Sequence, residues 1–162
     1  MSWITHTPLF LVGSSLVFVA ALLLLAWVDI KAGLLPDILT IPLAWIELLV
    51  NLNGMIVPLQ TAVVGAAGGY LTLWTFNRLY KLVSGTDGMG YGDFKMTAAL
   101  GAWLGAALLP WLLLGAALFG LGMYCAERTT DAGNKHFAVP FGPGLAFSGI
   151  AGIIMAVYSR LA

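Results

Sequence analysis

The sequence has few charged residues and one cysteine. Only 9% of its 162 residues are charged and 60% are hydrophobic, with a mean hydropathy of +0.96, whereas roughly a quarter of the residues in a soluble domain are charged. The net charge is zero, so no basic surface argues for nucleic-acid binding. Cys125 alone excludes an intrachain disulfide and a Cys-x-x-Cys zinc site, and His6 and His136 lack metal-binding neighbours at ligand spacing. We therefore expect an integral membrane protein without a metal or cofactor.

Long apolar runs predict an all-α, polytopic membrane helix bundle with about six transmembrane helices, which we expect to form one domain over residues 1–162. The run from Leu9 to Val28 has no basic residue before it, so we interpret it as a membrane helix and not as a cleaved leader. The expected helices cover residues 9–28, 37 to between 50 and 57, 59–82, 93 to about 109, 110 to about 127, and a segment after Gly144 that ends near Tyr158.

Basic residues divide unevenly between the connections. Six of the seven lie in or beside the first, third and fifth connections: Lys31, Arg78, Lys81, Lys95, Arg128 and Lys135. By the positive-inside rule, these connections face the cytoplasm and both termini face outward. Most tryptophans fall near expected helix ends, which is typical of an interfacial belt: Trp27, Trp45, Trp74, Trp103 and Trp111.

The segment Gly88–Lys95 is the one charged, glycine-dense interruption between the apolar runs. Its glycines permit positive φ angles and close approach to another helix. Asp93 in this segment and Asp29 at the end of the first helix should lie at similar depth on one side. Two carboxyls close together in a poorly solvated site cannot both ionise cheaply, so one keeps a proton while the other can activate water, as in an aspartic protease. The alternative is that each acid independently borders a helix end.

Three motifs resemble those of the prepilin peptidases, the membrane aspartyl proteases of type IV pili and type II secretion. Residues 90–95 read Gly-x-Gly-Asp-x-Lys, residues 29–37 read Asp-x6-Pro-Asp, and residues 139–144 form a proline-glycine segment. The resemblance covers nearly the whole chain from Ala26 onward. It implies that Asp29 and Asp93 are catalytic, that the enzyme lies in the bacterial inner membrane, and that the substrate is a prepilin or pseudopilin whose basic leader is cut after a glycine on the cytoplasmic side.

Many members of that family also carry an amino-terminal cytoplasmic domain with paired cysteines that methylates the new amino terminus. This sequence has neither the domain nor the cysteines. We therefore expect cleavage without methylation, or a chain from which that domain was removed. The lipid bilayer is an expected partner, and the sequence does not give the oligomeric state.

Several residues near the acids are candidate supporting groups. Gly90 and Gly92 are expected to let the substrate or the first helix approach Asp93, or else to form an ordinary flexible loop. Asp37 suits the first turn of a helix, Lys95 suits contact with lipid phosphates more than an ion pair with Asp93, and Thr97 lies one turn from Asp93 as a hydrogen-bond partner.

Glu47 belongs to none of these three motifs, although an acid within a membrane helix requires a partner or water. It leaves open a second hypothesis, a small transporter in which Asp29, Asp93 and Glu47 relay protons or bind a cation. A third is an inactive scaffold of a pilus assembly machine. Acids gathered at one face beside a glycine-rich loop favour the protease.

Overall fold

A computed structural model describes residues 8–130 and 140–161 of the chain. Within these ranges the chain forms six α-helices, two 3-10 turns and no strand: α1 (Pro8–Ala32), α2 (Asp37–Val50), η1 (Asn51–Asn53), α3 (Leu59–Ser84), α4 (Tyr91–Leu104), η2 (Ala106–Leu108), α5 (Leu109–Thr130) and α6 (Gly142–Leu161). The predicted all-α helix bundle is confirmed. His6, Lys135, His136 and Val139 lie outside the described residues.

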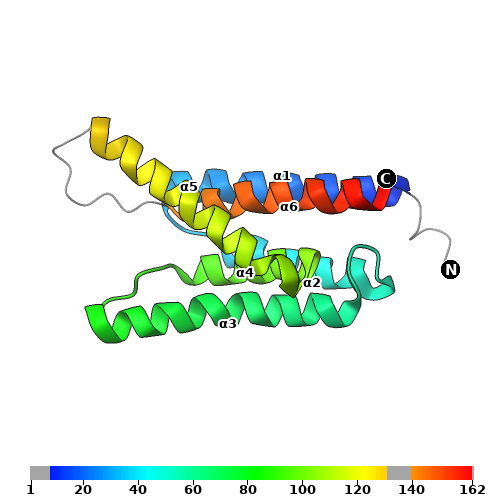
Figure 1. The fold of residues 1–162 in the computed structure, drawn as a ribbon, viewed down its shortest axis with the longest axis horizontal. Helices are drawn as coiled ribbons and strands as arrows, with labels where there is room; N and C mark the ends of the chain where they lie inside the picture. The colour runs from blue at the N-terminus through cyan, green and yellow to red at the C-terminus, as the bar shows by residue number, and fades with distance from the viewer. Residues whose placement is uncertain (1–7, 131–139, 162) are drawn as a thin grey trace.

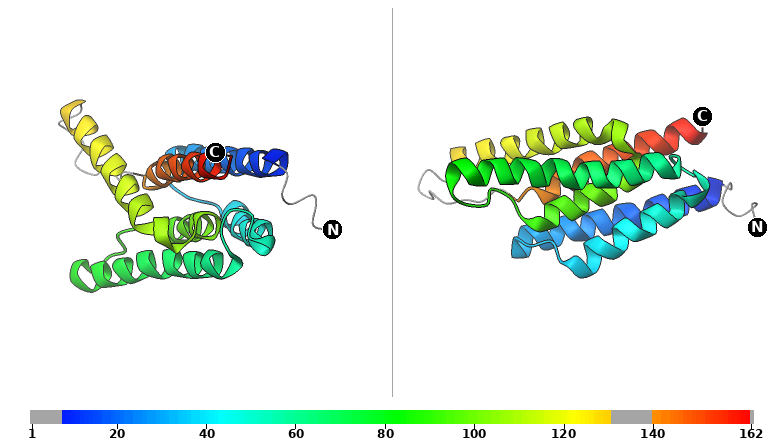
Figure 2. Two further views of the ribbon diagram at one scale, coloured as in Figure 1. Left: turned by 45° about the vertical axis from the view of Figure 1, so that its right-hand side comes forward. Right: turned by 90° about the horizontal axis from the view of Figure 1, so that it is seen from below.

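The helices are arranged around α4 (Figure 1). α3 packs along one side of α4, and α2 and α6 contact other sides of it. α1 and α6 run side by side, and α5 packs against α6 but diverges from the bundle toward its carboxyl end (Figure 2). Because α4 is enclosed by its neighbours, most of its side chains are buried, including Phe94, Met96 and Leu100.

α4 ends earlier than the sequence predicts, and α2 ends at the shorter of its two predicted limits. α4 stops at Leu104 and not near residue 109, because Gly105 adopts a positive φ of 80° with an extended ψ of 169°, which ends the helix. α2 stops at Val50, and the side chain of the next residue, Asn51, forms hydrogen bonds with α4 and with the chain that follows α2. The amide of Asn51 donates to the Ala102 carbonyl at 2.9 Å and its Oδ1 accepts the Ile56 N–H at 3.0 Å. This side chain therefore fixes the end of α2 against α4.

Among the described helices, three are long and apolar enough to cross a membrane by length and composition: residues 8–32, 106–126 and 142–160. α3 has 26 residues but is less apolar. α2 and α4 have 14 residues each, a rise of about 21 Å, which is less than the roughly 30 Å of a hydrocarbon core. The expectation of about six spans thus corresponds to six helices of unequal length.

Small residues let α3 and α4 pack closely. Gly65 and Gly101 face each other, and a Cβ on either one would overlap the backbone of the other. A Cβ on Gly69 would lie 2.8 Å from the Thr97 carbonyl oxygen. This close packing brings the carboxyl end of α3 alongside the start of α4.

Trp103 differs from the sequence expectation. It is 1% exposed and packs against Phe18 of α1 with ring centroids 4.9 Å apart. Its position near the end of α4 suggested the membrane interface, but α4 is central and its last turn faces α1. Trp27, Trp45 and Trp111 are exposed, as an interfacial belt requires.

Candidate active site

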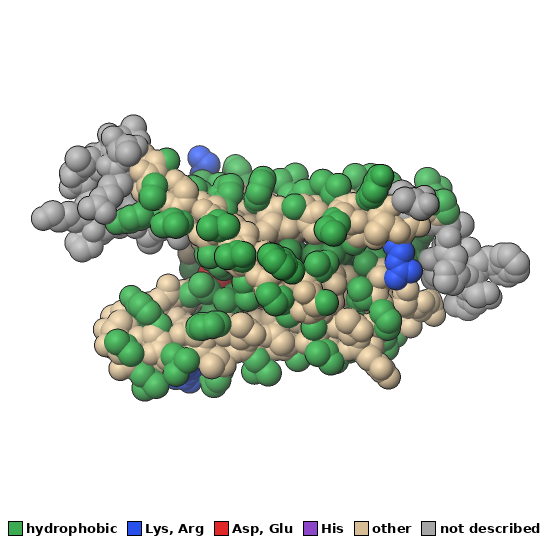
Figure 3. All heavy atoms as spheres, in the orientation of Figure 1, with side chains coloured by type: hydrophobic (Ala, Val, Ile, Leu, Met, Phe, Trp, Pro, Cys, Tyr) green, Lys and Arg blue, Asp and Glu red, His purple; other side chains and the backbone are tan. Residues whose placement is uncertain are grey.

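A cavity of about 950 Å³ lies at one end of the bundle. Its walls are the last turn of α1, the connection from α1 to α2, residues 88–92, the first turn of α4, Met123 of α5, and residues 140–141 before α6. The outer surface is hollowed between two layers of helices at this end, with acidic side chains at the base of the recess (Figure 3). Segments from across the whole chain therefore converge here.

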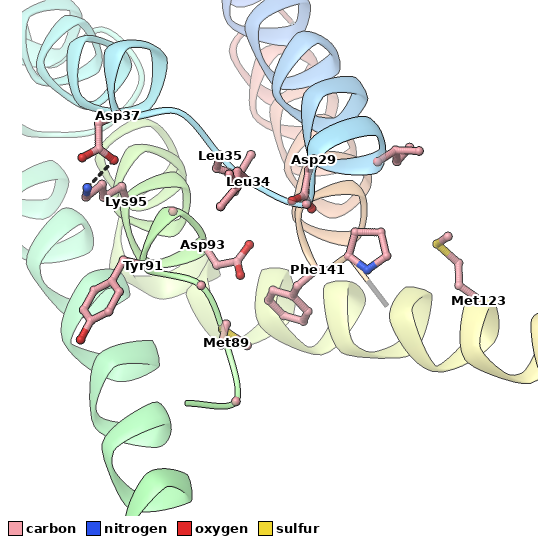
Figure 4. Close-up of a pocket in the computed structure, with 16 residues that line it drawn as sticks. Asp29, Leu34, Leu35, Asp37, Met89, Tyr91, Asp93, Lys95, Met123 and Phe141 are labelled. Atoms are coloured by element: carbon pink, nitrogen blue, oxygen red, sulfur yellow. Dashed lines mark hydrogen bonds and ion pairs between the residues drawn. The ribbon is translucent and has the colours of Figure 1, made fainter. Parts of the chain in front are cut away.

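Asp29 lies in the last turn of α1, and its side chain points into the cavity (Figure 4). The residue is 7% exposed. Its Oδ2 accepts a hydrogen bond from the backbone N–H of Gly142 at 3.0 Å. The first residue of α6 thus contacts an acid 113 positions earlier in the chain.

Asp93 lies in the first turn of α4 and enters the same cavity from the opposite wall (Figure 4). It is 8% exposed. Its backbone N–H donates to the Gly90 carbonyl at 3.2 Å, and Thr97 Oγ1 donates to the Asp93 carbonyl at 2.8 Å. Thr97 therefore bonds to the backbone of Asp93 and not to its carboxyl, because its hydroxyl lies one helical turn along and reaches the carbonyl of the residue four positions earlier.

The two carboxyls are close enough for the charge of Asp29 to act on Asp93. They project from different helices into one largely buried space. Such a pair favours one proton shared between two carboxyls. The arrangement can supply an anion that takes a proton from water and a neutral acid that gives one to an oxygen.

Gly92 is in contact with the connection from α1 to α2. A Cβ at Gly92 would overlap Leu35 Cβ. The segment that comes close to Gly92 is therefore this connection and not α1, which was one of the two approaches expected from the sequence beside that of the substrate. At Gly90 a Cβ would meet Asp93 Oδ2 at an ordinary contact distance of 3.7 Å.

Lys95 and Asp37 form an ion pair at the edge of the cavity. Asp37 occupies the first turn of α2, as predicted. We expected Lys95 to contact lipid phosphates, and the sequence did not indicate its ion pair with Asp37. The two residues meet only because the start of α2 packs on α4.

Asn77 of α3 is a residue that the sequence reasoning missed. Its Oδ1 accepts the N–H groups of Gly88 and Met89 at 2.9 and 3.1 Å, and its Nδ2 donates to Asp87 Oδ1 at 3.1 Å. Lys81 Nζ contacts Asp87 Oδ2 at 2.7 Å and holds the pKa of Asp87 below its usual range. These bonds fix the loop that forms one wall of the cavity. The available signal was a lone amide on the last turns of an apolar helix, facing a glycine-rich loop.

Glu47 lies outside the cavity. It is 1% exposed within the bundle, and its Oε2 has no hydrogen-bond partner among the described residues. In the part of the chain that the structure describes, no group of three or more His, Cys, Asp or Glu side chains is arranged to hold a metal ion.

Comparison with known proteins gives a consistent family. The type IV leader peptidase family matches residues 16–125. A prepilin leader peptidase/N-methyltransferase of Neisseria gonorrhoeae is 46% identical over 148 residues, which are 91% of this chain and 48% of that protein. The protein of the same name from Pectobacterium carotovorum subsp. carotovorum is 48% identical over 141 residues, 87% of this chain and 50% of that protein. The chain spans about half the length of the curated relatives it matches. No solved structure matches it.

Proposed function

Because this chain belongs to the type IV leader peptidase family, we propose that it is an aspartyl endopeptidase that removes the leader peptide from type IV prepilins or type II secretion pseudopilins. The observation that carries this proposal is the position of Asp29 and Asp93 on facing walls of one cavity. The relatives are named for both peptidase and N-methyltransferase activity. We assign only the cleavage to the residues of this chain.

Hydrolysis uses the two carboxyls in different states. The ionised carboxyl takes a proton from water while the water oxygen bonds to the peptide carbonyl carbon. The protonated carboxyl gives its proton to the carbonyl oxygen, which stabilises the developing charge. When the carbon–nitrogen bond breaks, the first carboxyl returns its proton to the leaving nitrogen, and the second recovers one from the tetrahedral intermediate.

The cavity suits a peptide that continues into a hydrophobic segment. Leu34, Met89, Met123 and Phe141 contribute apolar surface beside the two acids. We propose that the enzyme is an inner-membrane protein, that this end of the bundle faces the cytoplasm, and that the cut follows a glycine. The basic residues Lys31, Arg78, Lys81 and Lys95 belong to connections or helix ends on this side, in accord with the positive-inside rule.

The proposal is tested by expressing the chain with a prepilin reporter in bacteria that lack their own prepilin peptidase. We expect removal of the leader by the parent and none by Asp29→Asn or Asp93→Asn, since each carboxyl has a separate task. Glu47→Gln is the matched control, because it makes the same change at an acid outside the cavity. Cleavage that persists in both aspartate variants would exclude the pair as the catalytic groups.

The pH dependence gives a second test. Cleavage that needs one proton on two carboxyls follows a bell-shaped pH profile. The measurement uses purified protein in detergent with a reporter that carries its leader. A rate that stays constant from acid to alkaline conditions would contradict the mechanism.

A further inference from the structure

The start of α6 supplies a backbone donor to one of the two acids and not to the other. The first N–H groups of a helix have no partner within the helix. Gly142, the first residue of α6, satisfies this need by donating to Asp29 Oδ2 at 3.0 Å. Pro143 follows it and has no N–H to offer. The residue type at position 142 also matters, because a Cβ there would lie 2.6 Å from Asp29 Oδ2 and 3.0 Å from its Cγ.

Exposure does not distinguish the two carboxyls, since Asp29 is 7% and Asp93 8% exposed. Their hydrogen bonding does distinguish them. The Gly90 backbone also acts on the Asp93 carboxyl, but among the described residues the bond that meets hydrogen-bond geometry at either carboxyl is the one from Gly142. A donor of this kind stabilises a carboxylate more than a neutral carboxyl, and the positive end of the α6 dipole adds to the effect.

We propose that Gly142 is a positioning residue for the cleavage reaction: its N–H holds Asp29 in the cavity as the anion, and its lack of a side chain leaves room for that carboxylate. This inference rests on the proposed function and assigns the two roles within it. Asp29 takes the proton from water as the water oxygen bonds to the peptide carbon. Asp93 gives its proton to the carbonyl oxygen. As the carbon–nitrogen bond breaks, Asp29 returns its proton to the nitrogen and Asp93 regains one from the intermediate.

Within residues 8–130 and 140–161, the remaining groups around Asp29 do not supply an alternative partner. The titratable side chains that line the cavity with it are Asp37, Tyr91, Asp93 and Lys95. Lys95 is paired with Asp37. α5 and the segment before α6 present Met123, Pro140 and Phe141 to the cavity, none of which carries a charge. Among the residues that the structure describes, the bond from Gly142 is therefore the local interaction that favours the Asp29 anion.

The test is the pH profile of kcat for the full chain with Gly142→Ala. The variant keeps the N–H, but its Cβ would lie 2.6 Å from Asp29 Oδ2 and displace the carboxylate from that donor. We therefore expect a roughly 10- to 100-fold lower kcat with little change in KM, the range for losing a hydrogen bond to a charged group. The acid limb of the profile should move to higher pH while the alkaline limb stays, because the acid limb reports the group that must be ionised. A shift confined to the alkaline limb would show that Asp29 carries the proton, and unchanged limbs and rates would show that Gly142 does not act through it.

Two glycine variants serve as controls. Gly144→Ala disturbs the same helix start, since its Cβ would lie 2.7 Å from the Ala116 carbonyl oxygen, but it does not touch Asp29. Gly122→Ala adds a methyl group where nothing lies within 4 Å. Neither should move the limbs of the pH profile. A parent protein that cleaves nothing would reject the proposed function together with this assignment, whereas an active parent with an unaltered Gly142→Ala variant would reject the assignment alone.

A stability cycle keeps the inference testable if Gly142→Ala folds poorly. The melting temperature is measured in detergent for Gly142→Ala in the parent and in an Asp29→Ala background. The loss should be large in the parent and small without the Asp29 carboxyl, because the atoms that the new methyl group meets belong to Asp29. An equal loss of melting temperature in both backgrounds would show that the side chain added at position 142 does not act through Asp29.

Discussion

Lys95 of α4 is paired with Asp37, the first residue of α2. The side chain of Lys95 is 24% exposed and that of Asp37 62%. Lys95 follows Asp93 by two residues on α4, and Asp37 directly follows the connection of residues 33–36, which leads from the last turn of α1, where Asp29 lies (Figure 4). The pair therefore links the two chain segments that carry the cavity acids.

The ion pair should help to position the acids without providing much stability. We expect Lys95→Met to lower the free energy of unfolding by about 1 kcal/mol or less, since the pair is partly exposed, and to lower cleavage roughly two- to fivefold. The exchange Asp37→Lys with Lys95→Asp should recover most of the loss. Arg78→Met, which removes a charge stacked on Trp74, is the control. An exchanged pair no better than Lys95→Met alone would argue against a positioning role.

The loop that carries the glycine-rich motif should depend on Asn77. Asn77→Ala removes three hydrogen bonds to residues 87–89, and we expect a loss of roughly 1 to 3 kcal/mol from the donors left unpaired. Hydrogen exchange of the Gly88 and Met89 amides should accelerate, and cleavage should fall because this loop walls the cavity. Gln60→Ala, at the exposed opposite end of α3, should leave both unchanged. Slow exchange in Asn77→Ala would contradict this account.

The same loop should loosen in acid. The Lys81 ammonium, with Asn77 and Arg78, holds the pKa of Asp87 below its usual value. A carboxyl with a lowered folded-state pKa contributes stability above its unfolded pKa and loses it as the pH falls through the folded value. Corrected for the intrinsic pH dependence of exchange, protection of the Gly88 and Met89 amides should decline only on the acid side of the ordinary aspartate range. Lys81→Met should shift that decline to higher pH, and identical curves for the two proteins would refute the linkage.

Substitutions at Glu47 distinguish the peptidase hypothesis from that of a proton-relaying transporter. It lies ten residues after Asp37 on α2, about 15 Å along the helix axis, and its Oε2 is unpaired among the described residues. Glu47→Gln should keep cleavage within about twofold, and Glu47→Met should raise the free energy of unfolding by roughly 1 to 3 kcal/mol, because an unsatisfied buried oxygen is removed. Loss of cleavage in a folded Glu47→Met protein would instead give this acid a functional role.

The close packing of α3 on α4 should make the stability of the protein sensitive to any side chain added at Gly65. Gly65→Ala places a methyl group into the Gly101 backbone, which neither helix can avoid without moving apart. We expect a loss of roughly 1 to 3 kcal/mol or more, seen as a lower melting temperature and poor expression. Gly13→Ala, with nothing within 4 Å, is the control. Equal melting temperatures would mean that the helices separate at little cost.

The candidate site was predictable in part. The carboxyl end of the helix with Asp29 and the amino end of the helix with Asp93 could be placed at the same end of the bundle from the sequence. This was possible because hydrophobic runs and the distribution of basic residues depend on local sequence. Gly92 was expected to admit the substrate or the first helix, and the contact with Leu35 of the α1–α2 connection was not foreseen, since nothing local shows that Leu35 fills that space. Asn77 was missed because an amide can serve any loop, and its three bonds depend on how the chain turns after α3.

The sequence by itself determined the class of protein and the order of the helices, because burial in lipid demands apolar runs, and it singled out Asp29 and Asp93 as candidate catalytic acids. The tertiary structure alone decided the partner of each side chain. Asp29 meets an N–H 113 residues away and Lys95 meets a carboxylate 58 residues away. Hydrogen bonds and ion pairs act over a few ångströms, so only the packing of α1, α2, α4 and α6 selects which groups come within that range.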